Sequence, residues 1–184
     1  VLVPEIGLTP QTVNRFRRRF PDTPIMLWHS ALTDNERLQT WRFCEKGSCA
    51  IVIGTRSSIF LPFLKLGMIV VDEEHDASFK QQDGFKYHCR SLALYRAHQA
   101  GIPVVLGSAT PSLESLLNAR NAKFAHLKLT LRTGVDQSST MEIIDVANEA
   151  LTEGFSEQLL FRIQKHIEQR NQVLVFINRR GFAP

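Results

Sequence analysis

Short, uninterrupted apolar runs recur along this chain, separated by turns or by segments of helical periodicity. A strand that is covered on both faces has this character, whereas a half-exposed strand alternates polar and apolar residues. Strands in alternation with helices favour the α/β class with a doubly wound parallel sheet. The expected strands lie at residues 1–3, 25–28, 50–53, 68–71 and 104–106.

Helix-start signals stand between these runs. Thr9 followed by Pro10 suits a cap and a first helical turn, and Thr33 with Glu36 has the spacing of a capping box. Apolar residues at helical spacing follow the signals. Helices are expected from Thr9-Pro10 onward, at about residues 33–45 and 90–100, from Thr110-Pro111 through Leu117, and from Ser156 through Ile167.

The pattern changes in the last third of the chain. Leu127, Leu129 and Leu131 alternate with polar residues, as an edge strand does. Residues 133–140 are polar and loop-like, and residues 173–177 form another apolar run that we expect to be a buried strand. The predicted organisation is a first domain over 1–131, a connection over 132–148 and the start of a second α/β unit over 149–184.

Composition narrows the function classes only a little. Lys and Arg outnumber Asp and Glu by 22 to 18, a mild indication of a polyanionic partner that leaves a basic protein without a nucleic-acid role open. The three cysteines form no C-x-x-C pair, which argues against a disulfide framework or a zinc site and favours reduced thiols in a cytoplasmic protein. No apolar run approaches the ~20 residues of a membrane span. Apolar runs stand at both ends, so we expect an internal piece of a longer protein.

An acidic cluster, Asp72-Glu73-Glu74-His75-Asp76, directly follows the fourth expected strand. In a parallel sheet this position lies at the carboxyl edge, where ligands bind. Closely spaced carboxylates repel one another, and Mg²⁺ held together with a nucleotide phosphate offsets that repulsion. We therefore predict that Asp72 holds Mg²⁺ and that Glu73 orients and deprotonates an attacking water. The alternative is a solvated helix start, where acidic residues are also favoured. The absence of H-E-x-x-H argues against a zinc protease.

Two motifs together resemble those of a known enzyme class. The D-E-x-H pattern at Asp72 to His75 resembles the second motif of superfamily 2 helicases, and Ser108-Ala109-Thr110 resembles the third. Further stretches resemble the primosomal replication-restart helicases of bacteria, and this resemblance covers essentially the whole chain. They are residues 3–11, 54–58, 80–82 and 178–184.

The resemblance implies a fold, an activity and partners. It implies two RecA-like lobes that bind ATP and Mg²⁺ in the cleft between them, with residues 1–131 in the first lobe and 149–184 beginning the second. It implies translocation from 3′ to 5′ on single-stranded DNA at stalled forks, in the cytoplasm, with primosome proteins and single-strand-binding protein as partners. The family also carries a zinc site, for which this chain has no cysteine pattern.

The resemblance also assigns roles to residues. His75, Ser108, Ala109 and Thr110 would couple the nucleotide state to the DNA surface. Cations and aromatic rings in a loop suit single-stranded DNA, where stacking contributes ~1–3 kcal/mol per base, and a helix N-terminus suits a phosphate. The expected DNA contacts are Glu5, Gly7, Leu8, Thr9, Pro10, Gln11, Gly54, Thr55, Arg56, Ser57, Phe79, Lys80, Phe85, Tyr87 and Arg90. The bland alternatives are that Gly54 only ends a strand and that Phe79 and Phe85 pack beneath a loop.

One expected part is missing from these residues. The phosphate-binding pattern G-x-x-x-x-G-K-[S/T] occurs nowhere in the 184 residues. We therefore predict that this chain alone neither binds ATP tightly nor hydrolyses it. Two other readings stay open: a different superfamily 2 motor, and a nucleic-acid-binding or scaffolding module with a decayed ATPase site. Residues 5–11 and 181–184 favour the replication-restart family over the first, and the intact Asp72 and Glu73 argue against the second.

Overall fold

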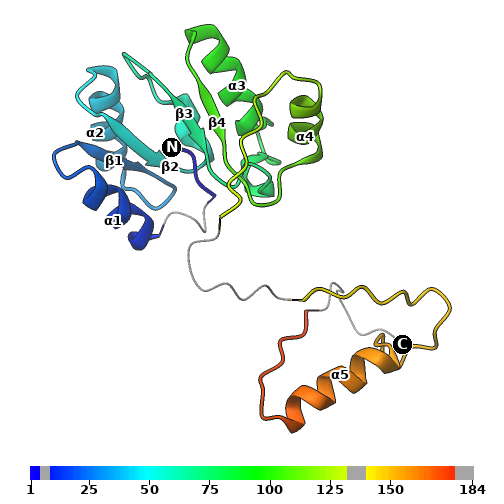
Figure 1. Ribbon diagram of the computed structural model, residues 1–184. Helices are drawn as coiled ribbons and strands as arrows, with labels where there is room; N and C mark the ends of the chain where they lie inside the picture. The colour runs from blue at the N-terminus through cyan, green and yellow to red at the C-terminus, as the bar shows by residue number, and fades with distance from the viewer. Residues whose placement is uncertain (5–8, 132–139, 177–184) are drawn as a thin grey trace. The chain divides into compact units, whose positions relative to one another are not determined.

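The structure is a computed structural model that describes residues 1–4, 9–131 and 140–176. The chain divides into two compact units, Val1–Leu127 and Lys128–Pro184, and each is described by itself. The first unit contains all of the named strands, and the second contains one named helix, α5 (Glu157–Glu168) (Figure 1). The predicted connection over 132–148 remains a prediction.

Parallel strand pairs confirm the expected α/β class. Strand β1 (Ile25–Trp28) pairs with β2 (Ile51–Gly54), and β3 (Ile69–Val71) pairs with β4 (Val104–Leu106), each in parallel. The N-terminal segment lies between the pairs, because Leu2 bridges in parallel to both Gly54 of β2 and Val71 of β3. All strands therefore end at the same edge, an arrangement that fits a RecA-like fold.

All of the named α-helices except α4 agree with the capping signals in the sequence. Helix α1 (Pro10–Arg19) is capped by Thr9, and α2 (Asp34–Glu45) by the full capping box of Thr33 and Glu36. Helix α3 (Cys89–Ala100) ends at Gly101, and α5 begins after Ser156. Two short 3₁₀ helices, η2 (Arg56–Phe60) and η3 (Ala77–Phe79), follow β2 and β3.

The start of helix α4 differs from the prediction. The helix spans Leu113–Arg120 and its cap is Ser112, so it does not begin at Thr110-Pro111. Thr110 is instead held in a turn, because its N–H donates to the Ser108 hydroxyl at 3.0 Å. A residue before proline also avoids the helical region. The Ser112 hydroxyl accepts from the N–H of Ser115, as a cap requires.

Two predicted strands are absent from the described residues. Leu127, Leu129 and Leu131 are 88, 101 and 92% exposed and lie in irregular structure. Residues 173–176 are likewise irregular, with Leu174 98% exposed, and residue 177 lies outside the described part. A strand is stabilised by hydrogen bonds to a neighbouring strand, and the described structure supplies no neighbour for either segment. Apolar pattern alone was therefore insufficient.

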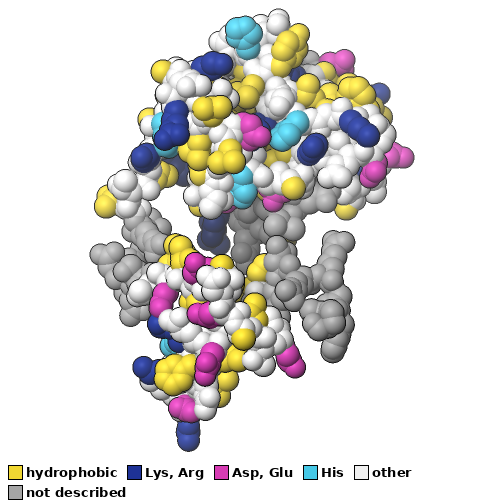
Figure 2. Space-filling model, turned by 90° about the vertical axis from the view of Figure 1, so that its right-hand side faces the viewer, with side chains coloured by type: hydrophobic (Ala, Val, Ile, Leu, Met, Phe, Trp, Pro, Cys, Tyr) yellow, Lys and Arg dark blue, Asp and Glu magenta, His cyan; other side chains and the backbone are white. Residues whose placement is uncertain are grey.

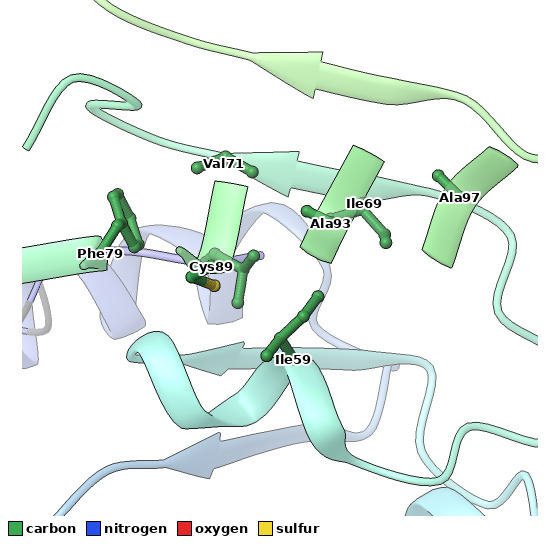
Figure 3. Packing of buried hydrophobic residues seen from close by; sticks show 8 residues of the cluster. Ile59, Ile69, Val71, Phe79, Cys89, Ala93 and Ala97 are labelled. Atoms are coloured by element: carbon green, nitrogen blue, oxygen red, sulfur yellow. The ribbon is translucent and has the colours of Figure 1, made fainter. Parts of the chain in front are cut away.

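The core of the first unit forms where α3 packs on β3. Figure 3 shows Ala93 and Ala97 of α3 facing Ile69 and Val71, with Ile59 of η2 beneath them. A second cluster lies between α2 and β2 and contains Cys44, Val52 and Leu61. The apolar runs predicted strands that are buried on both faces, but β4 is not fully covered, because Val105 is 47% exposed.

The surface mixes side chains of every kind. On the face of the first unit that carries α3 and α4, basic, acidic and apolar side chains are interspersed (Figure 2). The net charge of +4 is therefore not focused on this face. Among the described helices, none has the length and apolar character needed to cross a membrane.

Gly54 is required by space, which yields a stability prediction. A Cβ placed on Gly54 would lie 2.6 Å from Ser58 Cβ and 2.9 Å from the Trp28 carbonyl oxygen, so the Gly54→Ala substitution overpacks the end of β2. We expect it to lower the free energy of unfolding by about 1–3 kcal/mol, measured by urea denaturation. Gly67→Ala is the matched control, because a Cβ there meets nothing within 4 Å. Equal stability of the two variants would contradict the steric argument.

Candidate nucleotide and nucleic-acid site

Polar residues gather at the edge where the parallel strands end. Each strand is followed at once by chemically capable side chains, because the chain leaves the sheet there. Asp72 to His75 follow β3, and Ser108 to Thr110 follow β4 after Gly107. At the ends of the other two strands stand His29, Ser30, Thr55, Arg56 and Ser57.

Asp72 and Glu73 are exposed at this edge and form no ion pair with a Lys or Arg side chain among the described residues. The Asp72 carboxylate accepts from the N–H of Glu73 at 3.1 Å, and the Nδ1 atom of His75 lies 3.6 Å from Glu73 Oε2. Glu73 has φ 47°, a left-handed conformation that costs a non-glycine residue about 1 kcal/mol or more.

Glu74 has a different role from its neighbours. Its side chain is 2% exposed, and its carboxylate accepts from the Arg90 guanidinium at 2.5 Å and from the Ser112 N–H at 2.7 Å. Burial by itself raises the pKa of Glu74, but the Ser112 N–H and the Arg90 guanidinium outweigh burial and hold that pKa below its ordinary value. Glu74 therefore stays ionised and ties β3, α3 and α4 together.

The alternative that the acidic residues stand at a helix start holds for Asp76 only. Residues 72–75 form a turn, and the next helix is the three-residue η3. Asp76 caps η3, because its carboxylate accepts from the N–H of Ser78 at 2.7 Å. Hydrogen bonding from the Ser78 side chain, together with that from the Ser78 N–H, lowers the pKa of Asp76. Asp72 and Glu73 have no such capping partner among the described residues.

His75 joins the segments that follow β3 and β4. Its Nδ1 lies 2.7 Å from the Ser108 hydroxyl oxygen, and its Nε2 lies 3.3 Å from Thr110 Oγ1. Ala109 stands exposed between these two residues. The structure thus brings together the residues that were predicted to act as a coupling group, and a shift of either segment would change the contacts of the imidazole.

A polar hollow adjoins the end of β2. It is lined by four residues predicted to contact DNA: Thr55, Arg56, Ser57 and Tyr87. Of the other lining residues, Gln81 lies in the stretch 80–82 that carries the resemblance, whereas Ser30 and Ser78 were not among the expected DNA contacts. Ser30 stands just beyond the end of β1, so the rule that ligands bind at carboxyl edges would have found it.

Arg56 organises this hollow and is not a free cation. Its guanidinium donates to the carbonyl oxygens of Ser78 at 2.9 Å and Lys80 at 3.0 Å. These bonds hold the start of the loop of residues 80–88 against η2. The Lys80–His88 bridge and the bond from the Gln81 N–H to the Tyr87 carbonyl close that loop.

An aromatic row runs from η2 to the tip of this loop. The Phe60 and Tyr87 rings meet edge to face with centroids 5.0 Å apart, and the Tyr87 and Phe85 centroids lie 5.9 Å apart. Phe85 is 76% exposed and Phe60 is 47% exposed. Phe60 was not predicted, although its position directly after residues 54–57 in the chain was an available signal.

Two residues predicted to contact DNA are occupied elsewhere. Phe79 is fully buried in the core beside Val71 and Cys89 (Figure 3), so the alternative of packing beneath the loop describes it correctly. Arg90 is 12% exposed and is bound to Glu74 and Ser112. Neither side chain is free to contact DNA in this arrangement, because a buried group must first leave its partners.

The remaining predicted DNA contacts divide into described and undescribed residues. Thr9 caps α1, with Pro10 and Gln11 exposed in its first turn. Thr9 and Pro10 line a hollow with His29, which precedes Ser30 of the polar hollow in the chain. Glu5, Gly7 and Leu8 lie outside the described residues, as do residues 178–184.

The exposed carboxylates do not by themselves form a complete cation site in the described part of the chain. Within the described ranges, no group of three or more His, Cys, Asp or Glu side chains is arranged to hold a metal ion. Asp72 alone offers an exposed carboxylate beside Gly107, where a Cβ would stand 3.6 Å from Asp72 Oδ1. This suits Mg²⁺ that is bound mainly by nucleotide phosphates and water, with one or two protein carboxylates.

Comparison with known proteins identifies the family. The family described as DEAD/DEAH box helicase matches residues 1–119, which include the strands, the acidic cluster and the Ser108 to Thr110 segment. The chain belongs to the DEAD/DEAH box helicase family. The resemblance to superfamily 2 helicases is thereby confirmed for the part of the chain that carries both motifs.

Relatives of this helicase-family chain share one name. It is 53% identical to the replication restart protein PriA of Haemophilus influenzae over all 184 residues, which cover 25% of that protein. It is 40% identical to the protein of the same name from Bacillus subtilis and to that from Rickettsia felis; each match covers 100% of this chain and 23% and 28% of those proteins. The chain therefore spans about a quarter of the length of these relatives.

The buried ion pair yields the second prediction. Arg90→Ala leaves the Glu74 carboxylate buried without its cation, which costs about 3–5 kcal/mol. We expect a loss of that size in the free energy of unfolding, measured by urea denaturation. Arg162→Ala is the control, because Arg162 pairs with Glu142 at 2.6 Å but both side chains are about half exposed, and such pairs contribute about 0–1 kcal/mol. A loss for Arg90→Ala as small as that of the control would show that Glu74 does not need its partner.

Proposed function

We propose that this chain is part of the motor core of an ATP-dependent DNA helicase that acts at stalled replication forks to restart replication. One observation carries the proposal: Asp72 and Glu73 are exposed at the carboxyl edge of the sheet in a chain of the DEAD/DEAH box helicase family. Neither carboxylate forms an ion pair with a Lys or Arg side chain among the described residues. The names of the relatives at 40–53% identity supply the link to replication restart.

The two exposed carboxylates take different roles in this proposal. Asp72 would hold Mg²⁺ together with the nucleotide phosphates, and the bound ion would supply charge neutralisation at the transferred phosphoryl group. Glu73 orients the attacking water and accepts its proton. The Glu74 anchor supports both, because it holds the segment after β3 to α3 and α4 while it leaves its neighbours free.

The DNA surface is proposed along the ends of β1 and β2. Thr9 to Gln11, Gly54 to Ser57 and the polar hollow bind the sugar-phosphate backbone, which carries no base information. Phe85 and Tyr87, joined by Phe60, provide faces on which unstacked bases lie, with Lys80 as a nearby cation. Phe79 and Arg90 are left out of this surface, because the first is core and the second is ion-paired.

The coupling role rests on the contacts of His75. A change in phosphate state at Asp72 and Glu73 moves the segment after β3, and His75 passes that movement to Ser108 and Thr110 through its two ring nitrogens. The bonds between Arg56 and residues 78–80 connect the same segment to the polar hollow. Nucleotide and DNA thus act on one continuous set of hydrogen bonds.

The finer expectations belong to the same proposal. We propose a doubly wound first lobe, a second RecA-like lobe beginning near residue 149, movement from 3′ to 5′ and a cytoplasmic location. Forked DNA, primosome proteins and single-strand-binding protein are the proposed partners, and zinc belongs to other parts of the full-length protein. The 184 residues alone are proposed to be inactive on ATP, because the phosphate-binding pattern is not among them.

The third prediction tests Glu73 in the full-length protein. Glu73→Gln keeps the size of the side chain but removes the proton acceptor, so we expect loss of DNA-stimulated ATP hydrolysis by at least about 10²-fold with ATP binding retained. The measurements are phosphate release and binding of a fluorescent ATP analogue. Glu153→Gln is the control, because Glu153 is another exposed glutamate with positive φ, 52°. Undiminished turnover in Glu73→Gln would remove Glu73 from the proposed role.

The fourth prediction tests the aromatic row. Loss of one stacking face costs about 1–3 kcal/mol of binding, so Phe60→Ala, Tyr87→Ala and Phe85→Ala should each weaken single-stranded DNA binding by about 5- to 150-fold. Fluorescence anisotropy of a labelled oligonucleotide measures this. Tyr95→Ala is the control, because Tyr95 is 64% exposed on α3 and lies outside the row. Affinity that changes for Phe85 and Tyr87 but not for Phe60 would limit the surface to the loop.

A further inference from the structure

Two of the three cysteines meet although no C-x-x-C pattern joins them. Cys44 Sγ and Cys49 Sγ lie 3.5 Å apart, and both are free thiols. Gly47 brings them together: at φ 67° it turns the chain back after α2, and the N–H of Ser48 donates to the Phe43 carbonyl at 2.9 Å. A Cβ on Gly47 would also meet Leu64 Cδ2 at 3.3 Å. The contact between the sulfurs is thus built into the end of the helix.

The two thiols differ in access. Cys44 is 1% exposed and packs with Val52 and Leu61, whereas Cys49 is partly exposed at the edge of the same cluster. Burial and the hydrogen bond from Cys49 raise the pKa of Cys44 to about 12. A reagent in solution therefore reacts first with Cys49. Cys44 is accessible only to the sulfur of Cys49.

The third cysteine provides a contrast within the chain. Cys89 is fully buried, donates a hydrogen bond to the Arg56 carbonyl oxygen at 3.3 Å, and has no sulfur neighbour among the described residues. Burial raises the pKa of Cys89 to about 12. Its thiol is a packing group in the α3–β3 core (Figure 3), which makes it an internal control for reactivity.

We propose that Cys44 and Cys49 form a reactive dithiol site that takes small-molecule disulfides and other bidentate thiol reagents and closes to a reversible intramolecular disulfide. A sulfur–sulfur bond is about 2.05 Å long. The sulfurs must therefore approach by about 1.5 Å, a distance that side-chain rotation at the partly exposed Cys49 supplies. Under reducing conditions the site is a dithiol, the state of the structure.

The exchange proceeds in two balanced steps with a low-mass disulfide, RSSR, as the oxidant. Cys49 as thiolate attacks one sulfur of the reagent, and RS⁻ leaves and takes up a proton. Cys44 then attacks the Cys49 sulfur, its proton passes to the second departing RS⁻, and the Cys44–Cys49 bond forms. The protein dithiol is oxidised by two electrons and RSSR is reduced to two RSH.

Closure acts on residues beside the proposed DNA surface. The cluster around Cys44 includes Trp28, whose indole N–H donates to the Ser57 hydroxyl at 2.9 Å. A disulfide between Cys44 in α2 and Cys49 would restrain the segment that connects α2 to β2. Gly54 to Ser57 stand at the end of that strand. The dithiol reaction itself needs neither DNA nor nucleotide, so its test is independent of the proposed helicase activity.

The test uses oxidised glutathione on the full-length protein under native conditions. The exchange is stopped with acid, the remaining thiols are alkylated with a maleimide after denaturation, and the protein is digested with trypsin without reductant. Cleavage after Arg42, Lys46 and Arg56 places Cys44 in residues 43–46 and Cys49 in residues 47–56. We expect these two peptides to appear joined by a disulfide, with loss of two of the chain's three alkylatable thiols, while Cys89 is alkylated.

Variants separate the two steps. Cys44→Ser should stop with glutathione on residues 47–56, Cys49→Ser should leave Cys44 unmodified, and Cys89→Ser should behave as the parent protein. Phenylarsine oxide, which needs two adjacent thiols, should link residues 43–46 to residues 47–56 in the parent and in Cys89→Ser only. Glutathione held on residues 47–56 of the parent without joining, or modification of Cys89 as fast as of Cys49, would overturn the proposal.

Discussion

A buried carboxylate, Glu74, is the interaction on which the rest of this site depends. It stands in the middle of an acidic run, yet only Glu74 is enclosed, bound to Arg90 of α3 and to the N–H of Ser112 before α4. An unpaired charge in that position would cost several kcal/mol, so the pairing is what allows the segment after β3 to pack on both helices. Asp72 and Glu73 then remain exposed on a backbone that the anchor holds in place.

The remainder of the edge divides between packing and binding. Phe79 and Arg90 lie on the inner side, where one fills the core and the other neutralises Glu74. Phe85 and Phe60 lie on the outer side with their rings exposed. Arg56 links the sides, because it donates to the backbone of the segment that begins the loop. A DNA strand and a nucleotide would therefore act on neighbouring parts of one hydrogen-bonded frame.

Local chemistry accounts for what was predictable from the sequence. Thr9, Thr33 and Ser156 cap their helices as expected, because a cap depends on a hydroxyl and a few neighbouring residues. Errors occurred where the outcome depended on distant partners. Leu127 to Leu131 had the alternation of a strand but no neighbour to pair with among the described residues. Residues 173–176 were apolar enough for a strand and are irregular for the same reason.

The sequence by itself determined the α/β class, the acidic pair Asp72 and Glu73, and the helicase motifs, because these depend on short patterns along the chain. The tertiary structure decided which side chains are available. Phe79 is buried and Arg90 is ion-paired with Glu74, so neither side chain is available. Phe60 packs against Tyr87, and the sulfurs of Cys44 and Cys49 lie 3.5 Å apart. The reason is physical: exposure and pairing depend on what packs against a residue, and those neighbours come from elements far away along the chain.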